Sequence, residues 1–127
     1  MKDHILHIAN LTASYGSIEV VHGVSMKVPE GGLITVIGAN GAGKSTLLNS
    51  IMGLVRATGE LRFGGQSLGP LATEKRFAAG ICLVPERREL FSDLTVEDNL
   101  LLGAFWRGRE ARLAKLSDVF ARFPRLS

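Results

Sequence analysis

Residues 38–46 read Gly38-Ala39-Asn40-Gly41-Ala42-Gly43-Lys44-Ser45-Thr46. An apolar run, Leu33–Ile37, precedes this stretch, and a segment with helix-forming composition, Leu47–Met52, follows it. A strand, a glycine-rich loop with the pattern G-x-x-x-x-G-K-[ST], and a helix are the three parts of a P-loop, which binds phosphate groups. We therefore predict an α/β fold in which residues 38–46 connect a buried strand to a helix.

The residue types in this loop suit a nucleoside triphosphate. Gly38, Gly41 and Gly43 allow a tight turn whose backbone N–H groups converge on an anion at the positive end of the helix dipole. Lys44 can reach the β- and γ-phosphates as a point charge. The Ser45 hydroxyl can take one position on Mg²⁺, which keeps waters and phosphate oxygens as its other ligands. The loop thus predicts a site for a nucleoside triphosphate and Mg²⁺.

The remaining loop residues complete this predicted site. Thr46 is expected to add backbone and hydroxyl contacts to the α-phosphate, while Asn40 and Ala42 belong to the binding loop, which Asn40 shapes. The alternative is a glycine-rich turn that links a strand to a helix and binds nothing.

Three segments resemble ATP-binding cassette (ABC) ATPases. Residues 38–46 resemble their Walker A segment, and Ala13–Gly16 resembles the A-loop, whose aromatic ring stacks on adenine. Leu83–Leu100 resembles the Q-loop region, with Glu86 where most cassettes carry Gln. That Glu, with Phe-Ser and Leu-Thr-Val-Glu after it, is similar to the second ATPase subunit of branched-chain amino acid (Liv-type) importers. The sequence departs from that subfamily at Arg87, where Gly is usual.

This resemblance implies roles for two further residues. Tyr15 is expected to stack on the adenine of ATP; the alternative is an edge-strand or core aromatic. Glu86 is expected to lie near the γ-phosphate and Mg²⁺, as a catalytic and metal-binding residue, with Arg87 or Arg88 to offset its charge. The alternative for Glu86 is an ordinary carboxylate in a surface loop.

The resemblance also implies an organisation and a set of partners. Residues 1–32 would form an antiparallel β region with the A-loop, residues 33–86 the P-loop core, and residues 87–127 the start of a helical subdomain. An ATP-binding subunit of an importer works with membrane permease subunits and a second ABC ATPase subunit, in a homo- or heterodimer. It would be cytoplasmic and peripheral on the inner face of the cell membrane.

Several motifs of a hydrolysing cassette are missing from these 127 residues. Pro85 follows the apolar run Ile81–Val84 where a Walker B strand needs Asp, and Phe63–Ser67 lacks the Ser of the signature. All three His precede the loop, so none can be the switch His. We therefore expect a cassette truncated in the helical subdomain, with the apolar run Leu33–Ile37 left exposed and no turnover. The alternatives are a nucleotide-binding remnant without ATPase activity and an unrelated P-loop kinase or GTPase.

Composition excludes several other classes. Apolar residues make up 46% and charged residues 21%, which is ordinary for a globular domain, and the net charge is +3. The arginines of the second half have no interleaved aromatics, so we expect a solvated helix face and no nucleic-acid partner. No apolar run approaches membrane-spanning length, which predicts no direct membrane insertion. Cys82, in an apolar run, is expected to be a small core residue.

Periodicity and end signals predict the other elements. Gly53 should end the helix after the loop, Thr95–Asp98 should open another as a capping-box variant, and Leu113, Leu116 and Phe120 should share one helical face. The expected strands are Ile5–Ile8 and Val24–Val28 (antiparallel), Glu60–Phe63, and Ile81–Val84 (buried); the further expected helices are Thr73–Ala79 and Arg109–Phe123.

Overall fold

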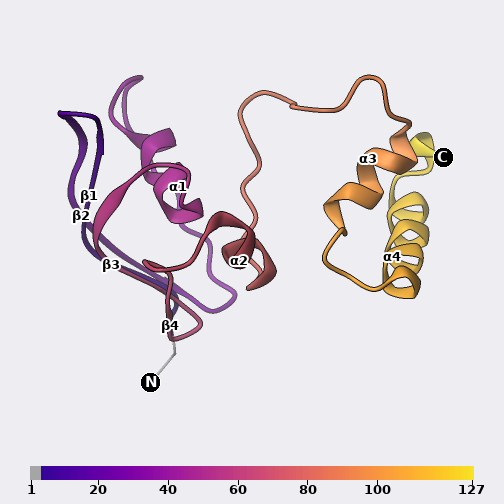
Figure 1. The fold of residues 1–127 in the computed structure, drawn as a ribbon, viewed down its shortest axis with the longest axis horizontal. Coiled ribbons are helices and arrows are strands. Elements are labelled where there is room, and N and C mark those ends of the chain that lie inside the picture. Colours follow the sequence, from indigo (N-terminus) through magenta and orange to yellow (C-terminus); the bar gives the residue numbers. More distant parts are fainter. Residues whose placement is uncertain (1–3) are drawn as a thin grey trace. The chain divides into compact units, whose positions relative to one another are not determined.

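The computed structural model of the chain describes residues 4–127 and divides into two compact units, one up to Leu83 and the other Val84–Ser127 (Figure 1). The elements of the first unit are β1 (His4–Tyr15), β2 (Ile18–Pro29), α1 (Lys44–Met52), β3 (Ala57–Phe63), β4 (Gln66–Ser67) and α2 (Thr73–Ala78). Those of the second are α3 (Val96–Gly103), α4 (Arg109–Arg122) and the short 3₁₀ helix η1 (Pro124–Leu126). None of the helices in residues 4–127 has the length and apolar character needed to cross a membrane.

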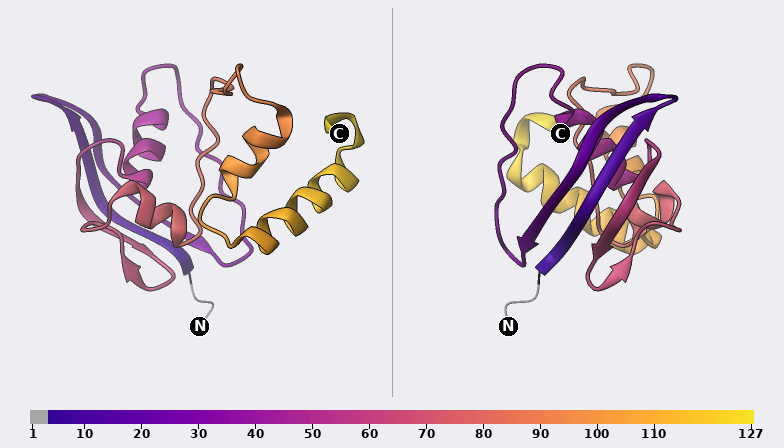
Figure 2. Two further views of the ribbon diagram at one scale, coloured as in Figure 1. Left: turned by 45° about the vertical axis from the view of Figure 1, so that its right-hand side comes forward. Right: turned by 90° about the vertical axis from the view of Figure 1, so that its left-hand side faces the viewer.

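The first unit is built on an antiparallel sheet with the strand order β2-β1-β3-β4 (Figure 2). β1 and β2 form a long hairpin in which Tyr15 pairs with Ile18 across a two-residue turn. The antiparallel strands predicted at Ile5–Ile8 and Val24–Val28 are therefore confirmed, as is the strand at Glu60–Phe63 with its following turn.

α1 packs on one face of this sheet and encloses the core. Ile8 and Leu11 of β1 and Leu61 of β3 are buried there with side chains of α1. Ile8 and Leu11 share a face although they are three residues apart, because the register shifts between them and Asn10 has φ 51°. This is the effect of a β-bulge, which adds one residue to the strand.

A buried arginine ties the end of α1 to α2. The Arg76 guanidinium donates hydrogen bonds through Nη1 to the carbonyls of Ser50 (2.9 Å) and Ile51 (2.8 Å), and through Nε to that of Leu71 (2.9 Å). Arg76 is only 6% exposed, and burial lowers the pKa of its guanidinium from the ordinary value. A cation is favoured at a helix C-terminus, where the last carbonyls have no partner inside the helix. Arg76 therefore anchors the helix that begins at the phosphate-binding loop, a role that the sequence analysis missed.

The strand predicted at Leu33–Ile37 is wrong. These residues form no strand, and Leu33 and Ile37 are 92% and 90% exposed, as the expectation of an uncovered apolar run implied. A β-strand needs a neighbour to pair its backbone N–H and C=O groups. The sheet formed by the described residues contains no strand adjacent to this run, so it stays without ladder hydrogen bonds.

The buried strand predicted at Ile81–Val84 is also wrong. Ile81 packs against the core of the first unit, but the segment is not a strand and Val84 is largely exposed. Cys82 is exposed rather than a core residue. The prediction of a buried strand rested only on the apolar composition of residues 81–84. The sheet formed by the described residues does not include this segment, so no neighbouring strand covers it.

The helix-end signals were predicted correctly. Gly53 follows α1 with φ 79°, as predicted. In the second unit the Thr95 hydroxyl accepts a hydrogen bond from the Asp98 N–H (3.1 Å) and donates one to the Asp98 carboxylate (2.7 Å), which caps α3. These signals hold because each depends on residues within one turn of the helix end.

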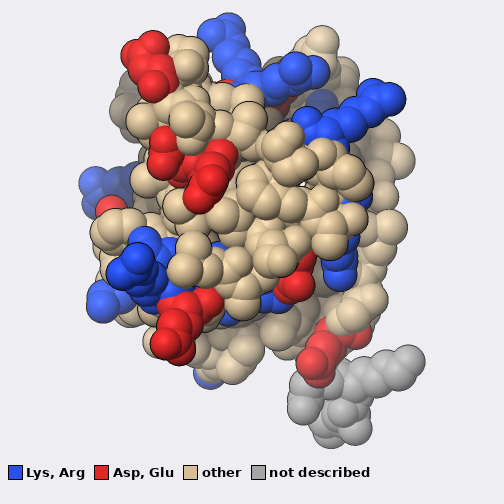
Figure 3. Space-filling view, turned by 90° about the vertical axis from the view of Figure 1, so that its right-hand side faces the viewer, with Lys and Arg blue, Asp and Glu red and all other residues tan. Residues whose placement is uncertain are grey.

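α4 confirms its predicted helix but not the whole of its predicted apolar face. Leu116 is buried and Phe120 half-buried, while Leu113 is exposed. On the face seen in Figure 3, the described Lys and Arg side chains are interspersed with Asp and Glu and do not gather into one basic stripe. Mixed charge of this kind is usual for a solvated protein surface.

Candidate functional site

The loop of residues 38–46 runs into the N-terminus of α1. The Ala42 N–H donates to the Ala39 carbonyl (3.1 Å), which closes a turn, and the Leu47 N–H donates to the Gly43 carbonyl (2.8 Å), which starts the helix. Gly43 is the N-cap and has no side chain that could bond the helix end. The first-turn N–H groups of Lys44, Ser45 and Thr46 precede the first residue that can find an acceptor within the helix. These donors form a site for an anion.

The first turn of α1, which carries these N–H groups, contains no Asp or Glu, so no carboxylate in that turn opposes a bound anion. The positive end of the helix dipole adds to the attraction of the N–H groups. Phosphate is a common ligand of helix N-termini built in this way.

Gly43 also sets how closely the loop approaches the sheet. Its φ is 92°, and a Cβ at this position would lie 2.9 Å from the Val20 carbonyl oxygen of β2. A side chain would therefore be strained by the backbone conformation and would also push the loop away from β2. The pattern of the loop predicted glycine at this position, but the contact with Val20 has no signal in the sequence.

The Lys44 ammonium lies over the backbone of the loop. Its Nζ donates hydrogen bonds to the carbonyls of Gly38 and Ala39, the latter at 2.8 Å. An anion held by the first-turn N–H groups would offer this ammonium charge-assisted hydrogen bonds, which are about twice as strong as neutral ones. A phosphate contact by Lys44 stays a prediction.

The other predicted loop residues differ in exposure. Ser45, the predicted Mg²⁺ ligand, is exposed at the helix N-terminus, whereas Thr46 is buried and its carbonyl accepts a hydrogen bond from Ser50 Oγ (2.7 Å). Asn40, Gly41 and Ala42 are exposed, and the φ of Gly41 is 85°. An exposed hydroxyl beside phosphate-binding N–H groups fits Mg²⁺, which takes few protein ligands when it is bound with phosphates.

Tyr15 lies at the end of β1 and is 52% exposed. Its cross-strand partner, Ile18, is two residues before Val20, whose carbonyl meets Gly43 of the loop. The tip of the β1–β2 hairpin and the loop before α1 lie at the same end of this unit (Figures 1 and 2). An exposed ring at this tip is able to stack on a base, and adenine stacking stays a prediction.

Glu86 belongs to the second unit, whereas the loop and Tyr15 belong to the first. Glu86, Arg87 and Arg88 are all exposed, and none of the ion pairs among the described residues includes them. Residues 4–127 contain no group of three or more His, Cys, Asp or Glu side chains that could hold a metal ion. A role for Glu86 beside Ser45 at Mg²⁺ therefore stays a prediction.

The sequence matches a known family and several relatives. Residues 21–125 match the protein family described as ABC transporter. The chain is 40% identical over 123 residues to the high-affinity branched-chain amino acid transport ATP-binding protein BraG of Pseudomonas aeruginosa, which covers 96% of this chain and 53% of the relative. It is 31% identical over 123 residues to the probable branched-chain amino acid transport ATP-binding protein LivF of Archaeoglobus fulgidus. This match covers 96% of this chain and 52% of the relative.

Solved structures show the same fold. An ATP-binding cassette of an ABC transporter superposes with a TM-score of 0.81 at 25% identity, over 98% of this chain and 56% of the other. A nucleotide-free ATP-binding cassette from an ABC transporter gives a TM-score of 0.73 at 28% identity. The match covers 89% of this chain and 46% of the other. The chain thus spans about half the length of the curated relatives it matches. The predicted α/β fold of ABC ATPases is confirmed, and the chain belongs to the ABC transporter family.

Proposed function

We propose that this chain binds ATP and Mg²⁺ through residues 38–46 and acts as the ATP-binding component of an ABC importer. The observation that carries the proposal is the N-terminus of α1, where first-turn N–H groups, a glycine N-cap and the Lys44 ammonium lie together. The relatives BraG and LivF, named for branched-chain amino acid transport, support these solutes as the cargo.

Each residue of the site has a proposed task. Lys44 contacts the β- and γ-phosphates, Ser45 takes one Mg²⁺ position, and Thr46 contributes its N–H near the α-phosphate. Tyr15 stacks on adenine from the hairpin tip. Bound Mg²⁺ would neutralise phosphate charge, and Glu86 would meet the metal or its waters.

The chain of 127 residues is expected to bind ATP without hydrolysing it. Ser45 is one Mg²⁺ ligand, and the described residues gather no cluster of carboxylates that would complete the metal site or orient an attacking water. The test pairs a calorimetric ATP titration with a malachite-green phosphate assay on the purified, monodisperse chain with Mg²⁺. We expect saturable binding and no phosphate release above that of Lys44→Ala.

Two outcomes would contradict this view. An absence of saturable binding would remove the proposed function itself. Steady turnover that Lys44→Ala abolishes would instead identify a complete ATPase and would point to Glu86, Glu89 or Asp93 as the carboxylate that activates water. The second candidate function, a nucleotide-binding remnant without ATPase activity, predicts the same binding result and differs from the first in having no permease contact.

We further propose that the Arg87–Asn99 segment docks on a membrane permease subunit, which would hold the protein at the inner, cytoplasmic face of the cell membrane. Leu90 and Phe91 are 70% and 61% exposed. The Asn99 side chain accepts from the Phe91 N–H (3.0 Å) and donates to the Phe91 carbonyl (3.0 Å), which holds the loop in place. Exposed apolar side chains on a fixed loop, rimmed by charges, suit a docking surface. A second ABC ATPase subunit is the other proposed partner.

Cross-linking is expected to detect this contact. Because Cys82 is exposed, it is first replaced by Ser, and a single Cys is then placed at Ser92 in the loop or at Ser117 on α4 as the control. In an assembled transporter, Ser92→Cys should form a permease adduct and Ser117→Cys should form none. Equal labelling from both positions, or adducts from Ser117→Cys alone, would argue against docking through this loop.

A further inference from the structure

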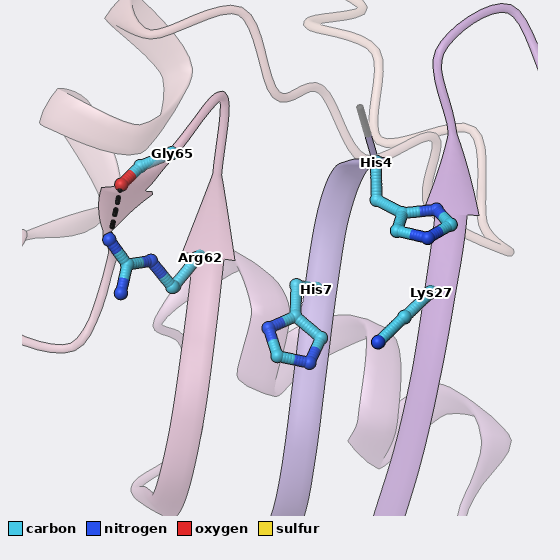
Figure 4. A pocket seen from close by; sticks show the side chains of 5 residues that line it. All are labelled: His4, His7, Lys27, Arg62 and Gly65. Atoms are coloured by element: carbon cyan, nitrogen blue, oxygen red, sulfur yellow. Dashed lines mark hydrogen bonds between the residues drawn. The ribbon is translucent and has the colours of Figure 1, made fainter. Parts of the chain in front are cut away.

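The sheet of the first unit carries a basic pocket of about 220 Å³ on its surface (Figure 4). It is lined by His4 and His7 of β1, Lys27 of β2, Arg62 of β3, and Gly65 of the β3–β4 turn. His7 is the cross-strand partner of both Lys27 and Arg62. The register of three adjacent strands therefore brings these cationic and titratable side chains into one row.

The strand pattern places this row away from the core. Ile8 and Leu61 are buried under α1, so His7 and Arg62, the neighbours of these residues, point to the opposite face. Lys27 and Arg62 flank His7 on the two neighbouring strands, so their positive charges lie roughly 10 Å apart and repel each other. Of the described residues, none that lines the pocket is acidic. A bound anion would relieve this repulsion.

Lys27 and His7 face the same space, and Arg62 lies at its edge. Figure 4 shows the Lys27 side chain pointing toward His7, whereas the Arg62 guanidinium points the other way, toward Gly65. Arg62 is steadied by a hydrogen bond from Nη2 to the Gly65 carbonyl (2.8 Å) and lies 3.5 Å from the Glu60 carboxylate through Nη1. Glu60 offsets part of the Arg62 charge, but a guanidinium has five N–H donors and retains others for a ligand.

This pocket lies far from the nucleotide loop. His7 and Tyr15 are eight residues apart on β1, a separation of roughly 25 Å along a strand. Tyr15 is at the hairpin tip close to the loop, and His4 and His7 are at the other end of the same strand. An ATP molecule in residues 38–46 would not reach the pocket.

We propose that this pocket is a second anion site, which binds the phosphate group of a phosphate monoester. The Lys27 ammonium and the His4 and His7 imidazoles offer donors to a phosphate dianion, and the Arg62 guanidinium keeps N–H groups for it at the edge of the pocket. The volume is smaller than the 300–1,000 Å³ typical of sites for drug-sized ligands, so the pocket holds a phosphate group rather than a whole nucleotide. The phosphate can come from a soluble ester or from a lipid headgroup.

Histidine side-chain NMR provides the test, because the chain has three histidines and one lies outside the pocket. His22 of β2 pairs with Glu19 at 2.6 Å and serves as the internal control. Inorganic phosphate and methyl phosphate are titrated separately at constant pH and ionic strength into the Lys44→Ala chain, in which binding at the loop is weakened. We expect saturable shifts of the His4 and His7 resonances with either phosphate, while His22 stays unchanged.

Variants and vesicles complete the experiment. Lys27→Gln or Arg62→Gln should weaken phosphate binding about tenfold, the equivalent of one charge-assisted hydrogen bond. Lys75→Gln removes the same charge from α2 and should change nothing. Shifts only with phosphatidic acid vesicles, and not with phosphatidylcholine alone, would support the site and assign the source to a lipid. Shifts that do not saturate, that His22 shares, or that Lys75→Gln weakens equally would overturn the proposal.

Discussion

Replacing Lys44 with alanine is expected to weaken ATP binding by about a hundredfold. The Lys44 ammonium lies over the loop, held by the carbonyls of Gly38 and Ala39, where it can donate to phosphate oxygens. Two hydrogen bonds to a charged partner contribute about 3 kcal/mol or more, which corresponds to a factor of about 100 in affinity. Tyr15→Ala is expected to have a smaller effect, because stacking of one base contributes ~1–3 kcal/mol.

Calorimetric titration of ATP into each variant measures this difference. Lys75→Ala is the matched control, since it removes one exposed lysine from the same unit without touching the loop. Its affinity should equal that of the parent chain. If Lys44→Ala bound ATP as tightly as Lys75→Ala, the assignment of residues 38–46 as the nucleotide site would fail.

Replacing Gly59 with alanine is expected to lower the free energy of unfolding by about 3 kcal/mol or more. Gly59 lies in β3 with φ 106°, and a Cβ there would be 2.4 Å from the Asn10 carbonyl oxygen and 2.8 Å from its carbonyl carbon. Both atoms are backbone atoms of β1, so the clash cannot be relieved by a change of side-chain rotamer. Backbone strain costs ~1–3 kcal/mol by itself, and displacement of β1 from β3 adds to it.

Thermal unfolding followed by circular dichroism should show this as a fall in Tm of about 10 °C or more. Gly64→Ala is the control, because Gly64 also has a positive φ (54°) but no atom lies within 4 Å of the added Cβ. Its Tm should fall by only a few degrees, reflecting the cost of the left-handed conformation alone. Equal Tm values for the two variants would show that the approach of Gly59 to Asn10 does not limit stability.

Much of the candidate site could be predicted from local sequence. The pattern of residues 38–46 predicted a loop that leads into a helix, and Gly53 and Thr95 marked helix ends, all of which the structure confirms. Each of these features depends only on residues within about one helical turn of each other. The reason is that the backbone groups of a cap or a tight turn form their hydrogen bonds with residues nearby in the chain. Family resemblance added Tyr15 and Glu86, whose roles stay predictions.

Contacts between distant segments were decided by tertiary structure alone. Arg76 binds carbonyls about 25 residues earlier, and the row of His7, Lys27 and Arg62 exists only because of strand register. For the same reason Leu33–Ile37, which has strand composition, is not a strand: backbone pairing depends on a neighbour, and no local pattern reports whether one is present. The sequence by itself therefore determined the glycine-rich loop and the helix that follows it, whereas the tertiary structure decided what supports that loop and which charges gather on the sheet.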